Sequence, residues 1–398
     1  MRRARWIVAA KLESSRPVIY HCMSRAVNRE FVFGDLEREQ QRRFMRMYED
    51  FSGCRVLSYC FMSNHFHILL EVTPMPEGGL SDAELLKRLG AIYNEVQVAE
   101  VATELKEARK MIRKGLAGES YGAAIHARFT YRMHDLSQFM KSFTQRYTQW
   151  HNRTQRRTGR LWEDRFKSVI VEDGAACKTM AAYIDLNPVR AGMVQDPAAY
   201  RWSSYGEAVG GGAKGNGQKA RSGLVRAMLA HKGVGADAAL WTHDMSRETP
   251  AGTEGFGQNL KRRAATGRGT QNCVASQYRR ILLAGAVEKQ ELRVGSSGET
   301  EVKRTRRGMS AEQAQRENEQ LEKKPEQIPY GRMLRCRVRY FTDGAVIGSR
   351  AFVNEAFANA RERFSKARKD GARAMRGVAS GTKGVLWSAR DLRLRVGG

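Results

Sequence analysis

One stretch of the sequence, residues 55–72 (RVLSYCFMSNHFHILLEV), constrains the fold more than any other. Two apolar runs flank a short polar break, which predicts adjacent strands of one sheet joined by a tight turn. Because side chains at i and i+2 of a strand share a face, His65 and His67 should project together and Phe66 should point to the opposite face. Paired imidazoles on a rigid strand suit a divalent metal ion. The same spacing fits two hydrogen-bonded histidines on a solvated sheet face, because the pattern is short.

The segments before this stretch indicate the fold class. Residues 18–25 (VIYHCMSR) are rich in β-formers and predict a first strand, and residues 35–51 have the apolar spacing of an amphipathic helix. The order strand, helix, strand, strand begins a ferredoxin-like α+β fold, in which helices pack on an antiparallel sheet.

The charge of the chain points to a polyanionic partner. The 398 residues include 69 Lys and Arg against 42 Asp and Glu, a formal net charge of +27, which favours nucleic acid over an anionic membrane surface. No apolar run approaches the roughly 20 residues of a spanning helix, and the apolar part of the basic N-terminus is too short for a signal peptide. Six scattered cysteines without a CxxC pair predict reduced thiols. We therefore expect a cytoplasmic protein without a membrane role.

The remaining segments predict the domain organisation. Residues 1–205 form one domain, interrupted at about 81–116 by a helical insertion that we interpret as solvated and without chemistry. A Gly-rich linker at 206–221 then leads to a mostly helical basic region. That region divides into a partly ordered segment, 222–330, and a small nucleic-acid-binding module, 331–398, of winged or helix-turn-helix type.

A basic segment at residues 153–160 is a candidate DNA contact. Clustered arginines beside an aromatic ring suit phosphate contacts and base stacking, although a solvated basic loop has the same composition. The candidate DNA-binding residues are Arg153, Arg156, Arg157, Arg160, Trp162, Arg165 and Lys167.

A later helix could supply a nucleophile and a further metal ligand. Tyr183 and Asn187 are four residues apart and so share one helical face. The amide oxygen of Asn187 suits Mg²⁺ or Mn²⁺ beside histidine nitrogen. The phenol of Tyr183 could attack a phosphodiester, since a nearby cation favours the phenolate. The alternative is a packed tyrosine and an asparagine that caps the helix before Pro188.

Several sequence blocks together resemble one family. The strings YHCMSR, SYCFMSNHFHILLEV, GRLWEDRFKS, YIDLNPVRAGMV and WSSY, in this order over residues 18–205, are similar to those of the REP-associated tyrosine transposases. These enzymes belong to the HUH superfamily of single-strand DNA endonucleases. The helical insertion and the long C-terminal extension depart from the simplest members.

The resemblance implies a role for each site residue. His65 and His67 would bind the divalent metal, Tyr183 would be the nucleophile, and Asn187 would complete the metal site. Such enzymes cleave single-stranded DNA near a hairpin, form a 5′-phosphotyrosine and a free 3′-hydroxyl, and rejoin strands. The implied setting is the prokaryotic nucleoid, with the chain as monomer or homodimer.

Three alternatives remain open at this point. Tyr147 with His151 is a rival nucleophile–ligand pair, although the apolar spacing around Tyr147 favours core packing. A non-catalytic DNA-binding regulator could use the same fold. A basic RNA-binding protein would explain the charge without any catalytic constellation.

Overall fold

The computed structural model describes residues 16–230, 238–242, 273–286, 289–294, 300–306, 308–321, 339–342, 345–363, 368–375 and 386–389. The basic N-terminal segment 1–15 and parts of the predicted segments 222–330 and 331–398 lie outside these residues. No helix in the described part has both the length and the apolar character needed to cross a bilayer. Every cysteine in that part is a free, buried thiol.

The centre of the molecule is an antiparallel sheet of four strands in the order β2-β3-β1-β4. The strands are β1 (Val18–Arg25), β2 (Arg55–Phe61), β3 (His65–Val72) and β4 (Lys167–Val171). Helix α1 (Asp35–Ser52) joins β1 to β2, and helix α5 (Leu136–Thr154) precedes β4. This βαββαβ connectivity confirms the predicted ferredoxin-like α+β fold.

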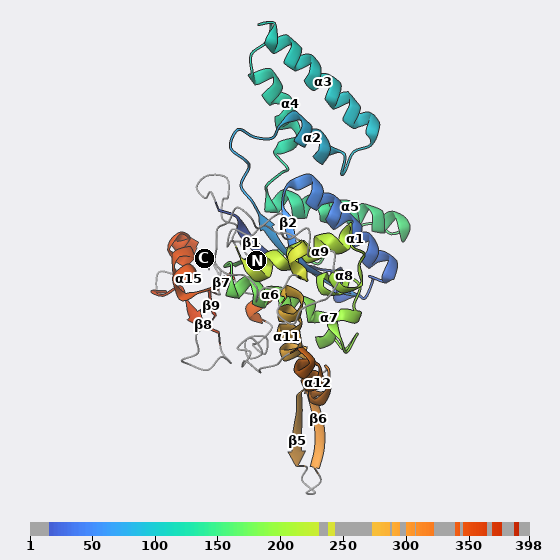
Figure 1. The fold of residues 1–398 in the computed structure, drawn as a ribbon, viewed down its shortest axis with the longest axis vertical. Coiled ribbons are helices and arrows are strands. Elements are labelled where there is room, and N and C mark those ends of the chain that lie inside the picture. Colours follow the sequence, from blue (N-terminus) through green and yellow to red (C-terminus); the bar gives the residue numbers. More distant parts are fainter. Residues whose placement is uncertain are drawn as a thin grey trace.

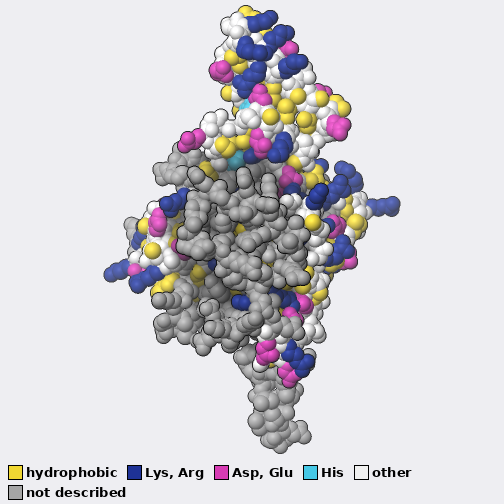
Figure 2. Space-filling model, in the orientation of Figure 1, with side chains coloured by type: hydrophobic (Ala, Val, Ile, Leu, Met, Phe, Trp, Pro, Cys, Tyr) yellow, Lys and Arg dark blue, Asp and Glu magenta, His cyan; other side chains and the backbone are white. Residues whose placement is uncertain are grey.

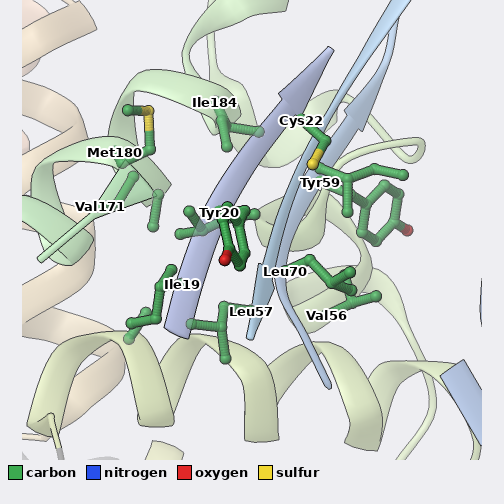
Figure 3. Close-up of a cluster of buried hydrophobic side chains, with 14 of the residues drawn as sticks. Ile19, Tyr20, Cys22, Val56, Leu57, Tyr59, Leu70, Val171, Met180 and Ile184 are labelled. Atoms are coloured by element: carbon green, nitrogen blue, oxygen red, sulfur yellow. The ribbon is translucent and has the colours of Figure 1, made fainter. Parts of the chain in front are cut away.

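Helices cover both faces of the sheet. On one face, Phe66 of β3 packs against Phe143 of α5, and α1 lies beside α5. On the other face lie α6 (Ala175–Asp185) and α9 (Asn216–Leu229), both in contact with β2. Figure 3 shows buried side chains of β1 and β4 beside Met180 and Ile184 of α6. Burial of both sheet faces explains why the strands are almost continuously apolar.

Three helices project from one end of the sheet (Figure 1). They are α2 (Asp82–Leu89), α3 (Glu95–Arg113) and α4 (Ser120–Thr130), so the insertion predicted at about 81–116 continues to Thr130. Ser81 and Asn94 cap α2 and α3 through their side chains. The projection carries interspersed acidic and basic side chains (Figure 2).

The predicted linker at 206–221 is wrong. Helix α8 (Ser204–Gly210) and helix α9 occupy most of it, and α9 packs on β2. Some of the glycines serve close packing here: a Cβ at Gly206 would lie 2.0 Å from the carbonyl oxygen of Tyr200, and one at Gly217 would lie 2.5 Å from that of Gly212. At these positions glycine allows close backbone contacts and does not mark a flexible segment.

The prediction of a separate module at 331–398 is also wrong. Strand β7 (Val346–Gly348) pairs in parallel with β4 and extends the central sheet. Strands β9 (Trp387–Ala389) and β8 (Arg373–Ala374) follow, giving the seven-stranded order β2-β3-β1-β4-β7-β9-β8. Pairing across more than 170 residues leaves no local pattern in a sequence, which is why the shared sheet was not predicted.

The remaining helices, strands and 3-10 turns complete the described chain. They are α7 (Asn187–Arg190), α11 (Val274–Ala286), α12 (Ala311–Leu321), α14 (Arg339–Thr342), α15 (Arg350–Ala358), the hairpin strands β5 (Lys289–Val294) and β6 (Thr300–Arg306), and the 3-10 turns η1 (Val27–Arg29), η2 (Pro197–Ala199), η3 (Ala238–Trp241) and η6 (Arg361–Arg363).

Candidate active site

The paired histidines lie at the start of β3, on the face covered by α6. Their ring centroids are 5.0 Å apart, while Phe66 packs on the opposite face against Phe143 and Trp162. The structure thus confirms that the two imidazoles share one face. His67 is fully buried and His65 is partly open to solvent.

Hydrogen bonds determine which nitrogen of His65 is available. Its Nδ1 lies 2.7 Å from Oδ1 of Asn64, and Nδ2 of Asn64 donates to the carbonyl of Arg29. The second bond orients the amide, so Oδ1 faces His65 as an acceptor and Nδ1 of His65 must donate. The lone pair on Nε2 of His65 is then available to bind a metal ion.

Both imidazoles are neutral near pH 7. Burial lowers the pKa of His65 to about 4 and lowers the pKa of His67 well below its ordinary value. The nearby guanidinium of Arg25 lowers both values further. A neutral imidazole with a bare nitrogen is the form that ligates a metal ion.

Tyr183 of α6 lies beside His67. Its ring centroid lies 5.9 Å from that of His67, and the side chain is buried. The guanidinium of Arg190 sits 4.2 Å from the ring centroid, and Arg190 also donates to the carbonyl of Tyr183. Phe341 of α14 stacks on the other side, with centroids 4.3 Å apart. The phenol is thus enclosed by an imidazole, a guanidinium and an aromatic ring.

Asn187 shows the capping contacts that were the alternative interpretation. Its Nδ2 lies 3.2 Å from the carbonyls of both Tyr183 and Ile184, at the point where α6 ends. These bonds involve only the amide nitrogen. The Oδ1 atom is the one that a hard cation would use, and its role as a ligand stays a prediction.

The rival pair, Tyr147 and His151, lies on the opposite side of the sheet. The ring of Tyr147 packs between Phe33 and Trp162, with centroids 5.8 and 5.9 Å away. Burial raises the pKa of Tyr147, which disfavours a phenolate. The structure therefore favours the core-packing interpretation.

The basic candidates lie near the junction of α5 and β4. Arg153, Arg156, Arg160, Arg165 and Lys167 are exposed, and Arg157 is partly buried. Trp162 differs from the expected stacking platform: its ring packs on Phe66 and its Nε1 donates to Thr148 Oγ1 over 3.0 Å. Lys167 pairs with Met23, which also pairs with His67, so these three residues lie in one row across β4, β1 and β3, on the α6 face.

Three residues near the site were not predicted. His21 of β1 contacts His67, and its place in the YHCMSR block and its strand parity could have shown it. Arg190 is seven residues after Tyr183, a spacing that returns to the same helical face. No sequence signal indicates Phe341, because it lies 158 residues beyond Tyr183 (183 to 341) in the extension.

Two comparisons with known proteins gave a match. Residues 14–78 match the family model described as "Transposase IS200 like", a segment that includes β1, α1, β2 and β3. The chain is also similar to a solved structure of a REP-associated tyrosine transposase bound to a REP hairpin, at 11% identity and a TM-score of 0.31. That match covers 54% of this chain and 89% of the other. No curated protein matches significantly.

Proposed function

We propose that the chain is an IS200-like transposase, since residues 14–78 match that family model, and that it nicks and rejoins single-stranded DNA through Tyr183. One observation carries the proposal: the ring of Tyr183 lies beside His67, which is one of two neutral imidazoles on the same sheet face. The non-catalytic regulator and the RNA-binding protein require no such arrangement.

The residues present fit a divalent cation, Mg²⁺ or Mn²⁺. Nε2 of His65 and of His67 would hold it, with Oδ1 of Asn187 as a further ligand. Among the described residues, no three His, Cys, Asp or Glu side chains gather as a metal cluster, so oxygen atoms of water or of DNA would fill the other positions. When bound, such a cation withdraws charge from the scissile phosphate.

The reaction itself is a transesterification. The Oη atom of Tyr183 loses its proton and forms a bond to phosphorus, while the bond to the 3′-oxygen breaks and that oxygen takes up a proton. The products are a 5′-phosphotyrosine and a free 3′-hydroxyl. Attack by a 3′-hydroxyl on the phosphotyrosine reverses the step and joins strands, so no external energy source is needed.

Cationic groups around the phenol support this chemistry. Arg190 lies over the ring on which the phenolate charge develops, and Arg25 lies opposite His65 in the β1–β3 register. Lys167 adds a positive charge on the same side of the sheet. Fixed cations stabilise both the phenolate and the phosphate that approaches it.

The substrate we propose is a single strand next to a hairpin, as the resemblance of the sequence blocks implies. Phe341 of α14 stacks on the ring of Tyr183, so the C-terminal extension borders the surface where we propose that DNA binds. The net charge of +27 is consistent with a polyanionic substrate.

Incubation of the protein with a labelled hairpin oligonucleotide and Mn²⁺, followed by a denaturing gel, tests the proposal. We expect a covalent protein–DNA adduct that is lost in Tyr183→Phe and reduced at least a hundredfold in His65→Ala. Tyr147→Phe is the matched control and should keep the adduct, because Tyr147 lies on the other sheet face. An adduct that persists in Tyr183→Phe would refute the assignment of the nucleophile. DNA binding without an adduct would favour the regulator.

A further inference from the structure

His21 forms a buried link between the candidate metal site and the C-terminal extension. Its Nε2 lies 2.9 Å from Nδ1 of His67, and its Nδ1 lies 2.8 Å from the carbonyl oxygen of Phe341. Both His21 and His67 are only 1% exposed, so water does not compete for these bonds. The two ring planes are nearly parallel, with centroids 5.1 Å apart and an angle of 18° between the planes, as expected for an in-plane hydrogen bond between two imidazoles.

The sheet register explains why the two rings meet. Met23 pairs with His67, and His21, two residues before Met23, pairs with Leu69. Because side chains two residues apart on a strand share a face, His21 lies diagonally opposite His67 on the same face of the sheet. The extension reaches His21 because β7, which starts five residues after Phe341 (341 to 346), pairs with β4 beside β1.

The proton positions follow from these partners. A backbone carbonyl can only accept, so Nδ1 of His21 carries the proton. A neutral imidazole carries one such proton, and Nε2 of His21 must therefore accept. Nδ1 of His67 then donates, which leaves Nε2 of His67 bare. Burial of His21 favours the neutral form of its imidazole.

We propose that His21 is a positioning residue that holds His67 in the tautomer with a bare Nε2, and that the Phe341 carbonyl fixes His21 in turn. This inference rests on the proposed function, because it assumes that His67 is a metal ligand. It gives the extension a part in the site: a carbonyl 320 residues away from His21 prepares the ligand before DNA arrives. His65 needs no such relay, because its neighbour Asn64 supplies the acceptor.

The outer partners of a metal-ligating histidine commonly change metal affinity 10- to 100-fold. We therefore expect His21→Leu, which removes the acceptor, to weaken Mn²⁺ binding by about that factor. His21→Gln places an amide oxygen near the position of Nε2 and should restore most of the affinity. A residue that only fills space would show the opposite order, since leucine fills the buried site at least as well as glutamine.

Two measurements on the full chain test the proposal. Nitrogen-15 NMR of labelled histidines in the metal-free protein should show His67 protonated at Nδ1 in the unaltered chain and in His21→Gln, and a mixture of tautomers in His21→Leu. Calorimetric titration with Mn²⁺ should show the matching order of affinities. His126→Gln, in the projecting helices, is the control and should leave both readouts unchanged.

Proton location separates failure of this inference from failure of the proposed function. If His67 of the unaltered chain carries its proton on Nε2, or if His21→Leu keeps both tautomer and affinity, the positioning role is refuted whatever the adduct assay shows. The spectrum of the unaltered chain decides the question even where a variant fails to fold. If the tautomers and affinities follow the expected order while no adduct forms, His21 keeps its role and the cleavage chemistry is wrong.

Discussion

The two faces of the central sheet each carry a tyrosine and a histidine, yet their surroundings differ. On the α5 face, Tyr147 and His151 lie among the aromatic rings of Phe33, Trp150 and Trp162. On the α6 face, Tyr183 and His67 lie among groups that donate, accept or carry charge. We therefore propose that the same residue types serve packing on the α5 face and chemistry on the α6 face, and that the groups around each pair decide its role.

The largest expected effect would break the packing face. Phe66→Ala removes a fully buried ring that contacts Phe61, Phe143 and Trp162, and we expect it to lower the free energy of unfolding by about 3–5 kcal/mol. Denaturant titration of the full chain measures the change. Phe31→Ala is the matched control: that ring is 81% exposed, and its loss should cost about 0.5 kcal/mol or less. Equal losses of unfolding free energy in Phe66→Ala and Phe31→Ala would show that packing on the α5 face does not stabilise the sheet.

The second prediction concerns a buried charge on the α6 face. Glu71 of β3 is fully buried and pairs with two arginines, Arg226 of α9 and Arg55 of β2. Arg226 is 2% exposed and Arg55 is 41% exposed. Arg226→Met leaves the carboxylate without its buried partner and should cost about 3 kcal/mol or more. Arg55→Met should cost about 1 kcal/mol or less, because water screens that pair.

This pair of variants compares a buried ion pair with a partly exposed one on the same carboxylate of the α6 face. The free energies of unfolding come from the same denaturant titration. A larger loss in Arg55→Met than in Arg226→Met would mean that burial does not set the strength of the pair.

Local patterns in the sequence predicted the elements next to the site well. The strand at 18–25 has the bounds of β1, and the i, i+2 rule placed both imidazoles on one face with Phe66 on the other. The helical spacing placed Tyr183 and Asn187 at one helix end. These features depend only on residues within a few positions of each other.

Features that depend on distant residues were missed. The parallel pairing of β7 with β4 and the bond from His21 to Phe341 join segments with no shared periodicity. The glycines at 206–217 suggested a flexible linker, because composition alone does not separate close packing from chain freedom. Trp162 was expected at the surface and instead packs on Phe66, a contact that requires the sheet to exist first.

The smallest expected effect lies in the projecting helices and provides a solvated reference for both sheet faces. Asp82 at the start of α2 bonds to Arg109 and His126, and the bond from Arg109 is the main cause that lowers its pKa from 3.8 to about 2. A carboxylate whose pKa is lower in the folded state stabilises that state above its unfolded pKa. The contribution should be complete above about pH 5 and mostly lost as the pH falls through 2. Because Asp82 is 30% exposed, we expect about 1 kcal/mol after allowance for solvent screening.

Hydrogen exchange of α2 and α3 measures this contribution without unfolding the sheet. Asp82→Asn should weaken protection by about 1 kcal/mol at pH 6, and the difference from the unaltered chain should shrink toward zero near pH 2. Glu119→Gln is the control, because Glu119 is 80% exposed and contacts the same Arg109 at 3.4 Å. It should leave the protection nearly unchanged. A pH-independent effect of Asp82→Asn would mean that packing and not charge stabilises the projecting helices. The projection would then differ from the α6 face, whose stability we expect to depend on a buried ion pair.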